Sequence, residues 1–485
     1  MSSRRCNCVS FFHPGGGCVK QSYLSLASDT FVFAAGNMLT KLIQFFLLPM
    51  YTALLTTEQY GVGELVNNMS ELLYPMCCLG IYEGVFRYAV DRDSNKREVF
   101  SSSFSVSLAL VPVVAAVGVA GYSLTGFDYT WYLVALCLAS SFRAVCMQFA
   151  KGLGMTKLYA ASGVASTLAL CILGYLLLGV FGSGVSGYLT ALLVSQLLQI
   201  VIVAYGARIW RYFSPRAVDG SLIRMLLRYS LPMIPNALAW WFVNLSGRYV
   251  VLFAEGAAVA GLYTAASKLP AVMNMVVTIF QQAWQIFSAR EYSSGDRDES
   301  FGTVLRVFSS ALLCAGSLVI ALTNPLSQIM LSGEFYEARL FVPLLMLGAV
   351  MNGYSTYFGT LYNAAKQNGM IFVTTLVGAL ANIAVGVMLS GFVGAWGPII
   401  GAVVAYALIS LLRAFDTRKL VRVWIDIVYQ AVGLCALFAE VIILSLDIPS
   451  ATVIALGVSA VLIIFTAVRY QDTWKRIVGL LKEGR

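Results

Sequence analysis

The sequence predicts an all-α polytopic membrane protein with about fourteen spanning helices, arranged as two parallel six-helix bundles around a central cavity plus two C-terminal helices. Its 485 residues are 59% apolar and only 11% charged, whereas soluble domains average about 45–50% apolar and about 25% charged residues. The mean hydropathy is +0.79. This composition excludes a disordered chain, a soluble nucleic-acid-binding protein and a small secreted protein held by disulfides.

Apolar stretches of roughly 20 residues, the length needed to span a bilayer, recur along the whole chain. The first stretch is too long for the core of a signal peptide, so we expect it to be retained. We expect spanning helices at residues 31–55, 62–85, 100–122, 129–150, 158–181, 184–205, 231–254, 257–287, 304–323, 340–364, 370–392, 395–413, 424–446 and 451–468.

Charges in the predicted loops indicate the orientation. When the N-terminus is placed in the cytoplasm, most of the 32 lysines and arginines fall on the cytoplasmic side. Only Arg339 falls in a loop on the outer side. The positive-inside rule therefore predicts cytoplasmic N- and C-termini. The net charge of +9 is accordingly a sign of topology and not of nucleic-acid binding.

A basic stretch divides the chain into two halves. Residues 58–61 (Glu-Gln-Tyr-Gly) and 258–261 (Ala-Val-Ala-Gly) occupy equivalent turns of the two halves. An even number of spans per repeat makes the two copies parallel, with a binding site between them. The expected segments are a cytoplasmic tail (1–28), an N-terminal bundle (29–207), the basic linker (208–230), a C-terminal bundle (231–415), two additional helices (416–468) and a basic cytoplasmic tail (469–485).

Polar side chains at helical spacing mark the first two predicted spans of each half. A charge at the centre of a spanning helix costs about 2.5–3.5 kcal/mol, so we expect these residues to face a hydrophilic cavity between the halves. The stripes comprise Asn37, Lys41 and Gln44; Glu64, Asn68 and Glu71; Asn236, Trp240, Asn244 and Arg248; and Thr264, Lys268, Thr278, Gln281, Gln282 and Gln285.

Several of these polar residues also have a structural interpretation. Lys41 and Glu71 would form an ion pair that only holds two helices together. Arg143 lies near enough to the inner boundary to extend its charged group to the interface. The amides of residues 281–285 would equally hydrogen-bond between helices.

Prolines occur in the same four spans, at positions 49, 75, 232, 235 and 270. Proline removes a backbone donor and bends a spanning helix. We therefore expect these helices to bend as the cavity opens to alternate sides, with Pro270 acting in gating.

Catalytic motifs are absent from the sequence, which has a single histidine, no P-loop and no metal-ligand spacing. We therefore expect a transporter without a cofactor and not an enzyme. A cavity lined by lysine and arginine favours an anionic ligand, and phosphate groups are the obvious candidate.

Four short segments in the first hundred residues carry a family likeness: Ser28–Thr30, Leu48–Tyr51, Glu58–Gly61 and Leu79–Tyr88. They resemble the bacterial polysaccharide (oligosaccharide) flippases of the multidrug/oligosaccharidyl-lipid/polysaccharide (MOP) exporter superfamily, and the likeness extends over both bundles. It implies that an undecaprenyl-diphosphate-linked glycan moves from the inner to the outer leaflet of the bacterial cytoplasmic (inner) membrane. It also implies a rocker-switch motion driven by a proton or sodium gradient or by the membrane potential.

Combined with the polar stripes, the resemblance assigns diphosphate binding to Lys41, Arg248 and Lys268, contacts with sugar hydroxyls to Asn68, Asn244 and Gln281, and ion coupling or gating to Glu71, Glu64 and Pro270. The expected partners are the lipid-linked glycan, membrane lipids, a polysaccharide polymerase and glycosyltransferases.

Three other functions stay open at this point. A lipid II flippase for peptidoglycan is similar in its number of spans, and its last two helices form a groove for the lipid tail. A multidrug exporter of the same superfamily usually has a net acidic cavity. If the protein were instead a scaffold for glycan-assembly enzymes, with no transport activity, its function would not require the buried charges.

Overall fold

The computed structural model describes residues 36, 38–91, 94–231, 233–292, 297–365, 367–446 and 448–471. Every regular element within these residues is a helix. The main helices are Met38–Leu54, whose second part is α2 (Leu48–Leu54), α3 (Thr57–Cys77), α4 (Ile81–Val90), α5 (Lys96–Thr125), α6 (Thr130–Gly152), α7 (Thr156–Gly174), α8 (Gly184–Gly206), α9 (Gly220–Ser230), α10 (Met233–Glu255), α11 (Ala257–Glu291), α12 (Arg297–Ala321), α13 (Thr323–Met330), α14 (Val342–Ala364), α15 (Asn368–Val393), α16 (Trp396–Asp416), α17 (Ile427–Ser445) and α18 (Ala451–Arg469).

The helices confirm the predicted fold class. Nine of those in the described part of the chain are long and apolar enough to cross a membrane. Gly333–Leu340 and α14, which meet at a bend of 53°, make a tenth when the pair is counted as one span. The other predicted spans are helical too where the structure describes them: α3, α10 and α11 carry polar stripes, and Met38–Leu54 is the described part of the first span. The chain is an all-α, multi-pass membrane protein.

Breaks interrupt the first two predicted spans near their prolines. The first helix is interrupted at Leu47, and Pro49 stands in the first turn of α2. Pro75 lies in the last turn of α3, after which Leu79 and Gly80 adopt φ values of 52° and 62° before α4 begins. This left-handed backbone suits a glycine. The second predicted span is therefore two helices and not one, because the chain turns between α3 and α4.

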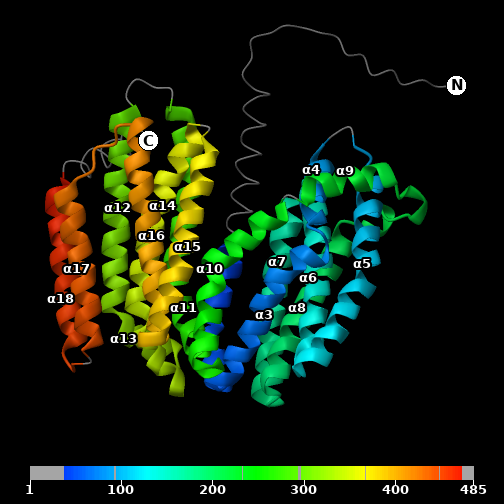
Figure 1. Cartoon of the computed structure of the whole chain (residues 1–485), viewed down its shortest axis with the longest axis horizontal. Coiled ribbons are helices and arrows are strands. Elements are labelled where there is room, and N and C mark those ends of the chain that lie inside the picture. Colours follow the sequence, from blue (N-terminus) through cyan, green and yellow to red (C-terminus); the bar gives the residue numbers. More distant parts are fainter. Residues whose placement is uncertain are drawn as a thin grey trace, which may run out of the picture.

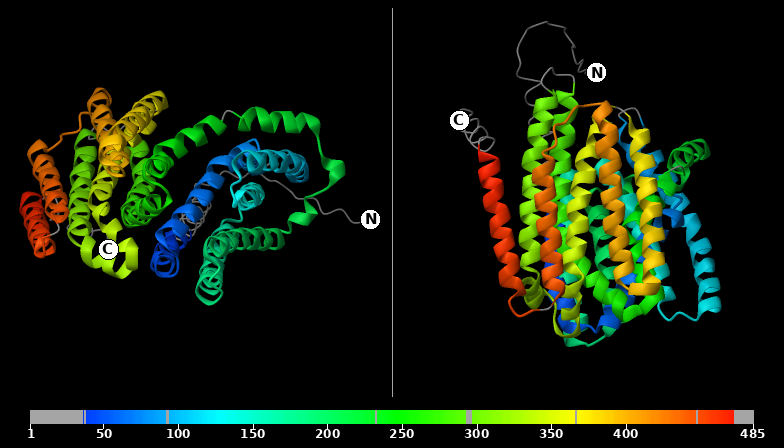
Figure 2. Two further views of the ribbon diagram at one scale, coloured as in Figure 1. Left: turned by 60° about the horizontal axis from the view of Figure 1, so that its bottom comes forward. Right: turned by 60° about the vertical axis from the view of Figure 1, so that its left-hand side comes forward.

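The helices form two groups, and one group carries an added pair (Figures 1 and 2). In the first group α3, α6 and α8 pack together, α7 packs on α8, and α4 and α5 pack on α6. In the second group α11 packs on α14, α14 on α16, α16 on α15, and α15 on α10. α12 packs against α14 and also against α17 and α18. The short helix α9 packs on α4 and α5.

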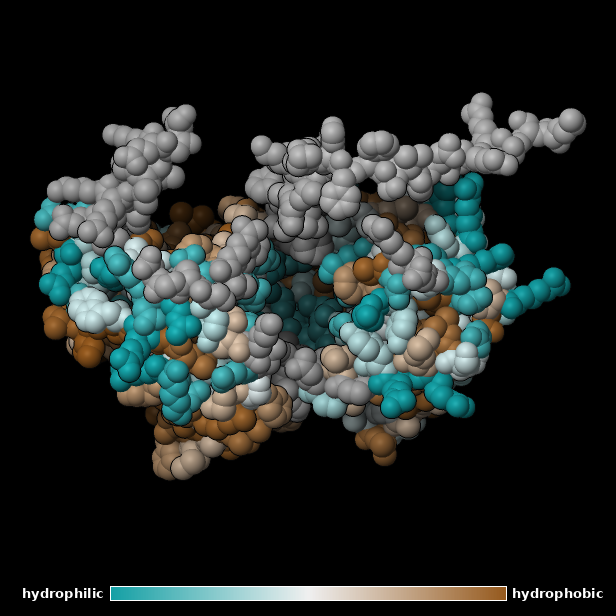
Figure 3. Space-filling view, turned by 90° about the horizontal axis from the view of Figure 1, so that it is seen from above, coloured by the Kyte–Doolittle hydropathy of each residue, from teal (hydrophilic) through white to brown (hydrophobic). Residues whose placement is uncertain are grey.

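The two groups meet where α3 approaches α10 and α11. Glycines permit this approach, because a Cβ on Gly61 would lie 2.1 Å from Ala257 O, and a Cβ on Gly261 would lie 2.1 Å from Thr57 O. We call this the closed end. Figure 3, which views the molecule from above Figure 1, shows a hollow between the groups with hydrophilic residues inside it. The molecule is therefore closed at the Gly61–Gly261 contact and hollowed toward the opposite end.

Buried polar contacts attach the C-terminal pair to α12. Glu440 of α17 is fully buried. It accepts hydrogen bonds from Ser317 Oγ of α12 at 2.6 Å and from Ser459 Oγ of α18 at 2.8 Å. At the start of α17, Asp426 Oδ2 accepts from Arg469 Nε of α18 at 2.9 Å. These contacts make α17 and α18 a fixed part of the second group.

Candidate functional site

A cavity of about 350 Å³ lies between the two groups. Lys41 of the first helix, Arg248 of α10 and Lys268 of α11 all line it, together with Gln44 and Asn274. Its lining among the described residues includes three cations and no carboxylate. A concave site with charges of one sign concentrates ligands of the opposite sign. We call it the cationic cavity, and it is suited to an anionic ligand.

A buried carboxylate joins the two groups beside this cavity. Glu64 of α3 belongs to the first group, and only 5% of its side chain is exposed. Lys268 Nζ donates to Glu64 Oε1 at 3.0 Å, and Arg248 Nη1 lies 3.7 Å from Glu64 Oε2. Both cations belong to the second group, so these ion pairs bridge the groups next to the closed end.

Two tyrosines complete the surroundings of Glu64. Tyr60 of α3 donates its hydroxyl to Glu64 Oε1 at 3.3 Å, and Tyr188 of α8 donates to the same oxygen at 3.0 Å. A buried carboxylate is costly unless it is paired and hydrogen-bonded in this way. The same two cations that neutralise Glu64 also line the cationic cavity. An anionic ligand in the cavity would therefore compete with Glu64 for Lys268 and Arg248.

Glu71 forms its ion pair with Arg143 and not with Lys41, the partner expected from the sequence. Glu71 Oε1 lies 3.6 Å from Arg143 Nη2 of α6, and no ion pair joins it to Lys41 among the described residues. The interpretation of Lys41 and Glu71 as a structural pair is therefore wrong for this conformation. Arg143 turns to Glu71 within the first group, and Lys41 is left exposed in the cationic cavity.

The remaining predicted site residues lie in different surroundings. Asn68 is buried on α3, one turn beyond Glu64. Gln281 is half-buried on α11 and lies outside the lining of the cationic cavity. Pro270 lines a neighbouring cavity of about 280 Å³ within the second group, which also includes Arg248. The side chain of Asn244 lies outside the described residues.

Some residues of the site were missed by sequence reasoning. Tyr188 lies in an apolar span, where nothing in the local pattern distinguishes it from a packing residue. Asn274 lines the cationic cavity, and it stands four residues before Thr278, a spacing that the stripe could have revealed. Among the described residues, no cluster of three or more His, Cys, Asp or Glu side chains is arranged to hold a metal ion.

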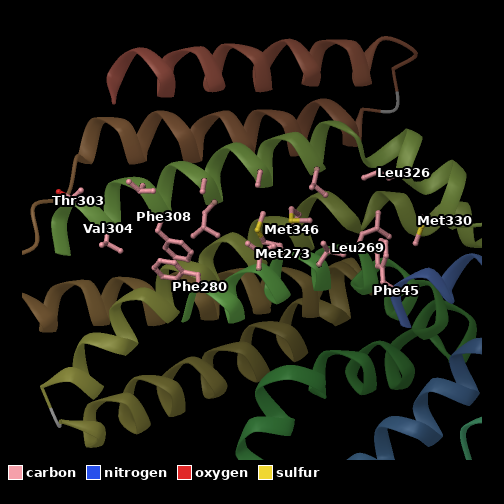
Figure 4. Close-up of a pocket in the computed structure, with 17 residues that line it drawn as sticks. Phe45, Leu269, Met273, Phe280, Thr303, Val304, Phe308, Leu326, Met330 and Met346 are labelled. Carbon is pink, nitrogen blue, oxygen red and sulfur yellow. The ribbon is translucent and has the colours of Figure 1, made fainter. Parts of the chain in front are cut away.

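An apolar cavity of about 750 Å³ lies beside the cationic cavity. It runs between α11 and α12, where Met273, Phe280 and Phe308 lie along it (Figure 4). Every residue that lines it is apolar except Thr303. Phe45 and Val272 line both this cavity and the cationic cavity. A cation-lined site and a large apolar site are therefore direct neighbours.

Comparison with solved structures shows the same fold in membrane transporters. The lipid II flippase MurJ in an inward closed conformation matches with a TM-score of 0.69 and 12% identity, over 91% of this chain and 99% of that chain. An inward-facing multidrug resistance MATE family transporter of the MOP superfamily matches with a TM-score of 0.65 and 14% identity, over 80% and 94% of the two chains. A MOP superfamily transporter from Pyrococcus furiosus matches with a TM-score of 0.55 and 15% identity, over 81% and 96%.

Sequence comparison identifies the family. Curated protein sequences gave no significant match. Residues 26–285, more than half of the chain, match the family described as polysaccharide biosynthesis protein. This match covers the first group of helices together with α10 and most of α11, which hold Lys41, Glu64, Arg248 and Lys268. The chain therefore belongs to the polysaccharide biosynthesis protein family and has the fold of the MOP superfamily.

Proposed function

We propose that this protein moves an undecaprenyl-diphosphate-linked glycan from the inner to the outer leaflet of the bacterial cytoplasmic membrane during cell-surface polysaccharide biosynthesis. Membership of the polysaccharide biosynthesis family supports the pathway. The fold shared with MurJ and a MATE transporter supports transport as the activity. In this proposal both termini face the cytoplasm, so the hollow opens toward the leaflet in which the glycan is assembled.

The shared wall of the cationic and apolar cavities carries the proposal. A polyprenyl diphosphate joins an anionic group directly to a long hydrocarbon chain, so it needs a cationic site and an apolar site in contact. Phe45 and Val272 provide that contact. Lys41, Arg248 and Lys268 would bind the diphosphate, because lysine and arginine both bind phosphate oxygens well. The apolar cavity would hold the first isoprene units.

This arrangement favours a lipid-linked anion over the other ligand classes. A soluble sugar nucleotide would leave the apolar cavity without a role. An organic cation, which many multidrug exporters carry, would be repelled by the three cations of the cavity.

Competition for the cations would couple binding to movement. A diphosphate bound to Lys268 and Arg248 would weaken their ion pairs with Glu64 and so loosen the closed end. A proton or sodium gradient or the membrane potential would then supply the energy of transport, with Glu64 or Glu71 as the coupling carboxylate. A polysaccharide polymerase, glycosyltransferases and membrane lipids are the partners that this role requires.

A leaflet assay in liposomes tests the proposal. The protein is reconstituted with an undecaprenyl-diphosphate glycan that carries a fluorescent label on its sugar, and a membrane-impermeant quencher reports which leaflet holds the label. We expect wild type to exchange the lipid between leaflets. We expect the Lys41→Ala/Lys268→Ala variant to slow the exchange about tenfold or more, since each lost charged hydrogen bond is worth about 1.5–3 kcal/mol.

Two matched variants sharpen this assay. Lys41→Arg should keep most of the activity, because it preserves the charge. Lys419→Ala removes an exposed cation of the pair with Asp416, outside the cationic cavity, and should leave the rate unchanged. If Lys41→Arg and Lys41→Ala lowered the rate of leaflet exchange equally, this would argue against neutralisation of the diphosphate charge by Lys41. Movement of cationic dyes in place of the lipid would support a multidrug exporter instead.

A further inference from the structure

A second polar cavity, of about 290 Å³, lies inside the first group of helices. Its walls come from the first helix, the α3–α4 junction, α6, α7 and α8. Three tyrosines and three glutamines face it: Tyr74, Tyr82, Tyr159, Gln44, Gln148 and Gln199. Its volume is near the lower end of the range for ligand sites, about 300–1,000 Å³. We call it the polar pocket.

Packing alone does not explain so many polar side chains around one space. Polar groups inside a membrane protein are costly, so those that only join helices are expected to bond one another directly. Gln196 of α8 does this, because its Oε1 accepts from Ser140 Oγ of α6 at 2.9 Å. In the polar pocket, by contrast, Gln148 Oε1 and Arg143 Nε are buried without a hydrogen-bond partner among the described residues. Such atoms call for a ligand or water.

The chemistry of the polar pocket fits a carbohydrate. Amides and phenolic hydroxyls both donate and accept hydrogen bonds, as do the hydroxyls of a sugar ring. The rings of Tyr74 and Tyr82 lie side by side with centroids 5.6 Å apart, which adds an apolar surface with polar tips. The one cation of the lining, Arg143, already faces Glu71 at 3.6 Å. A ligand in this pocket would therefore be recognised mainly by hydrogen bonds and not by charge.

The position of the polar pocket matches the order of groups in a lipid-linked glycan. Gln44 lines both the polar pocket and the cationic cavity. The next residue, Phe45, lines both the cationic cavity and the apolar cavity. The three sites therefore follow one another as apolar, cationic and polar. The three parts of a polyprenyl-diphosphate sugar follow one another in the same order.

We propose that the polar pocket binds the sugar attached directly to the diphosphate and so selects which glycan is carried. This assignment rests on the proposed flippase function. Gln199, which is only 6% exposed, and Tyr74 are expected to contact the sugar. The apolar and cationic cavities would hold parts that all such lipids share, so discrimination between glycans falls to the polar pocket.

Binding of defined lipids to the purified full-length protein tests this proposal. The probes are undecaprenyl diphosphate and a panel in which it carries glucose, galactose, N-acetylglucosamine or glucuronic acid, measured by native mass spectrometry in detergent. We expect wild type to bind at least one sugar-linked lipid about tenfold more tightly than the bare diphosphate. Gln199→Leu and Tyr74→Phe should each remove most of that difference, because each leaves sugar hydroxyls without a partner. Neither variant should change binding of the bare diphosphate.

Gln196→Leu is the matched control, since it removes an amide from the same helix outside the polar pocket. It should leave every affinity unchanged. Gln199→Leu and Tyr74→Phe should melt near wild type, whereas Gln196→Leu should melt lower, because Ser140 Oγ loses its acceptor. The proposal is overturned if no sugar raises the affinity of wild type, or if Gln199→Leu and Tyr74→Phe both preserve the difference. Failure of the flippase proposal looks different, because the bare diphosphate would then not bind, or would bind Lys41→Ala/Lys268→Ala as tightly as wild type.

Discussion

Replacing Glu64 with glutamine should open the closed end. Glutamine keeps an oxygen that accepts from Tyr60 and Tyr188, so local packing is preserved. It removes the negative charge that Lys268 Nζ meets at 3.0 Å and Arg248 Nη1 meets at 3.7 Å. Two cations of the second group then lose their counter-charge on the first group. The closed arrangement loses stability relative to any arrangement in which water reaches these cations.

The size of the effect follows from the burial of the partners. Removing one partner of a buried ion pair costs about 3–5 kcal/mol. Arg248 is 13% exposed and Lys268 is 31% exposed at the side chain, so the lower end of this range, about 3 kcal/mol, applies. A change of about 1.4 kcal/mol is tenfold in an equilibrium constant, so Glu64→Gln should shift the balance away from the closed form by about a hundredfold.

Distances between spin labels measure this shift. Leu124 at the end of α5 and Phe392 near the end of α15 are 85% and 87% exposed and lie on different groups. Electron–electron double resonance on a protein labelled at both positions should show a longer distance in Glu64→Gln than in wild type. Glu71→Gln is the matched control, because its ion pair with Arg143 lies within the first group. Unchanged distances in Glu64→Gln, or an equal change in Glu71→Gln, would refute the reasoning.

Three further changes test other parts of the account. Gly61→Val should prevent closure, because its Cβ would lie 2.1 Å from Ala257 O. The same pair of spin labels should then show the longer, open distance. Gly121→Val is the control and should leave the distance unchanged, because a Cβ at Gly121 has no neighbour within 4 Å. Pro270→Ala should slow leaflet exchange and leave lipid affinity intact, and an unchanged exchange rate would remove Pro270 from gating. Glu440→Gln should keep the melting temperature near that of wild type, because an amide oxygen accepts from the same serines. Glu440→Leu should lower the melting temperature, since unsatisfied buried hydroxyls cost about 1–3 kcal/mol, and equal melting temperatures would contradict this role.

The helices were predictable because hydrophobic length and period are local properties of the chain. The polar stripes lie on helices, because residues 57–77, 233–255 and 257–291 form α3, α10 and α11. The self-similar residues 58–61 and 258–261 are also instructive. They end in Gly61 and Gly261, which touch at the closed end, but they lie in the first turns of α3 and α11 and not in loops.

Pairing of the charges was not predictable, because it depends on which helix faces come together in space. The sequence identified Glu64, Arg248 and Lys268 as unusual, but not that one carboxylate serves both cations. It also offered Lys41 as the partner of Glu71, where the structure has Arg143. The polar pocket escaped notice because its glutamines and tyrosines are dispersed over several helices, and no single stripe contains them.

The most direct test of the central claim is to identify the lipids that co-purify with the protein. The protein is extracted in mild detergent, and its bound lipids are analysed by mass spectrometry in wild type and in Lys41→Ala/Lys268→Ala. The account predicts enrichment of a polyprenyl-diphosphate glycan in wild type and its loss from the variant. Bulk phospholipid alone in both samples would contradict a cationic cavity built for a lipid-linked diphosphate.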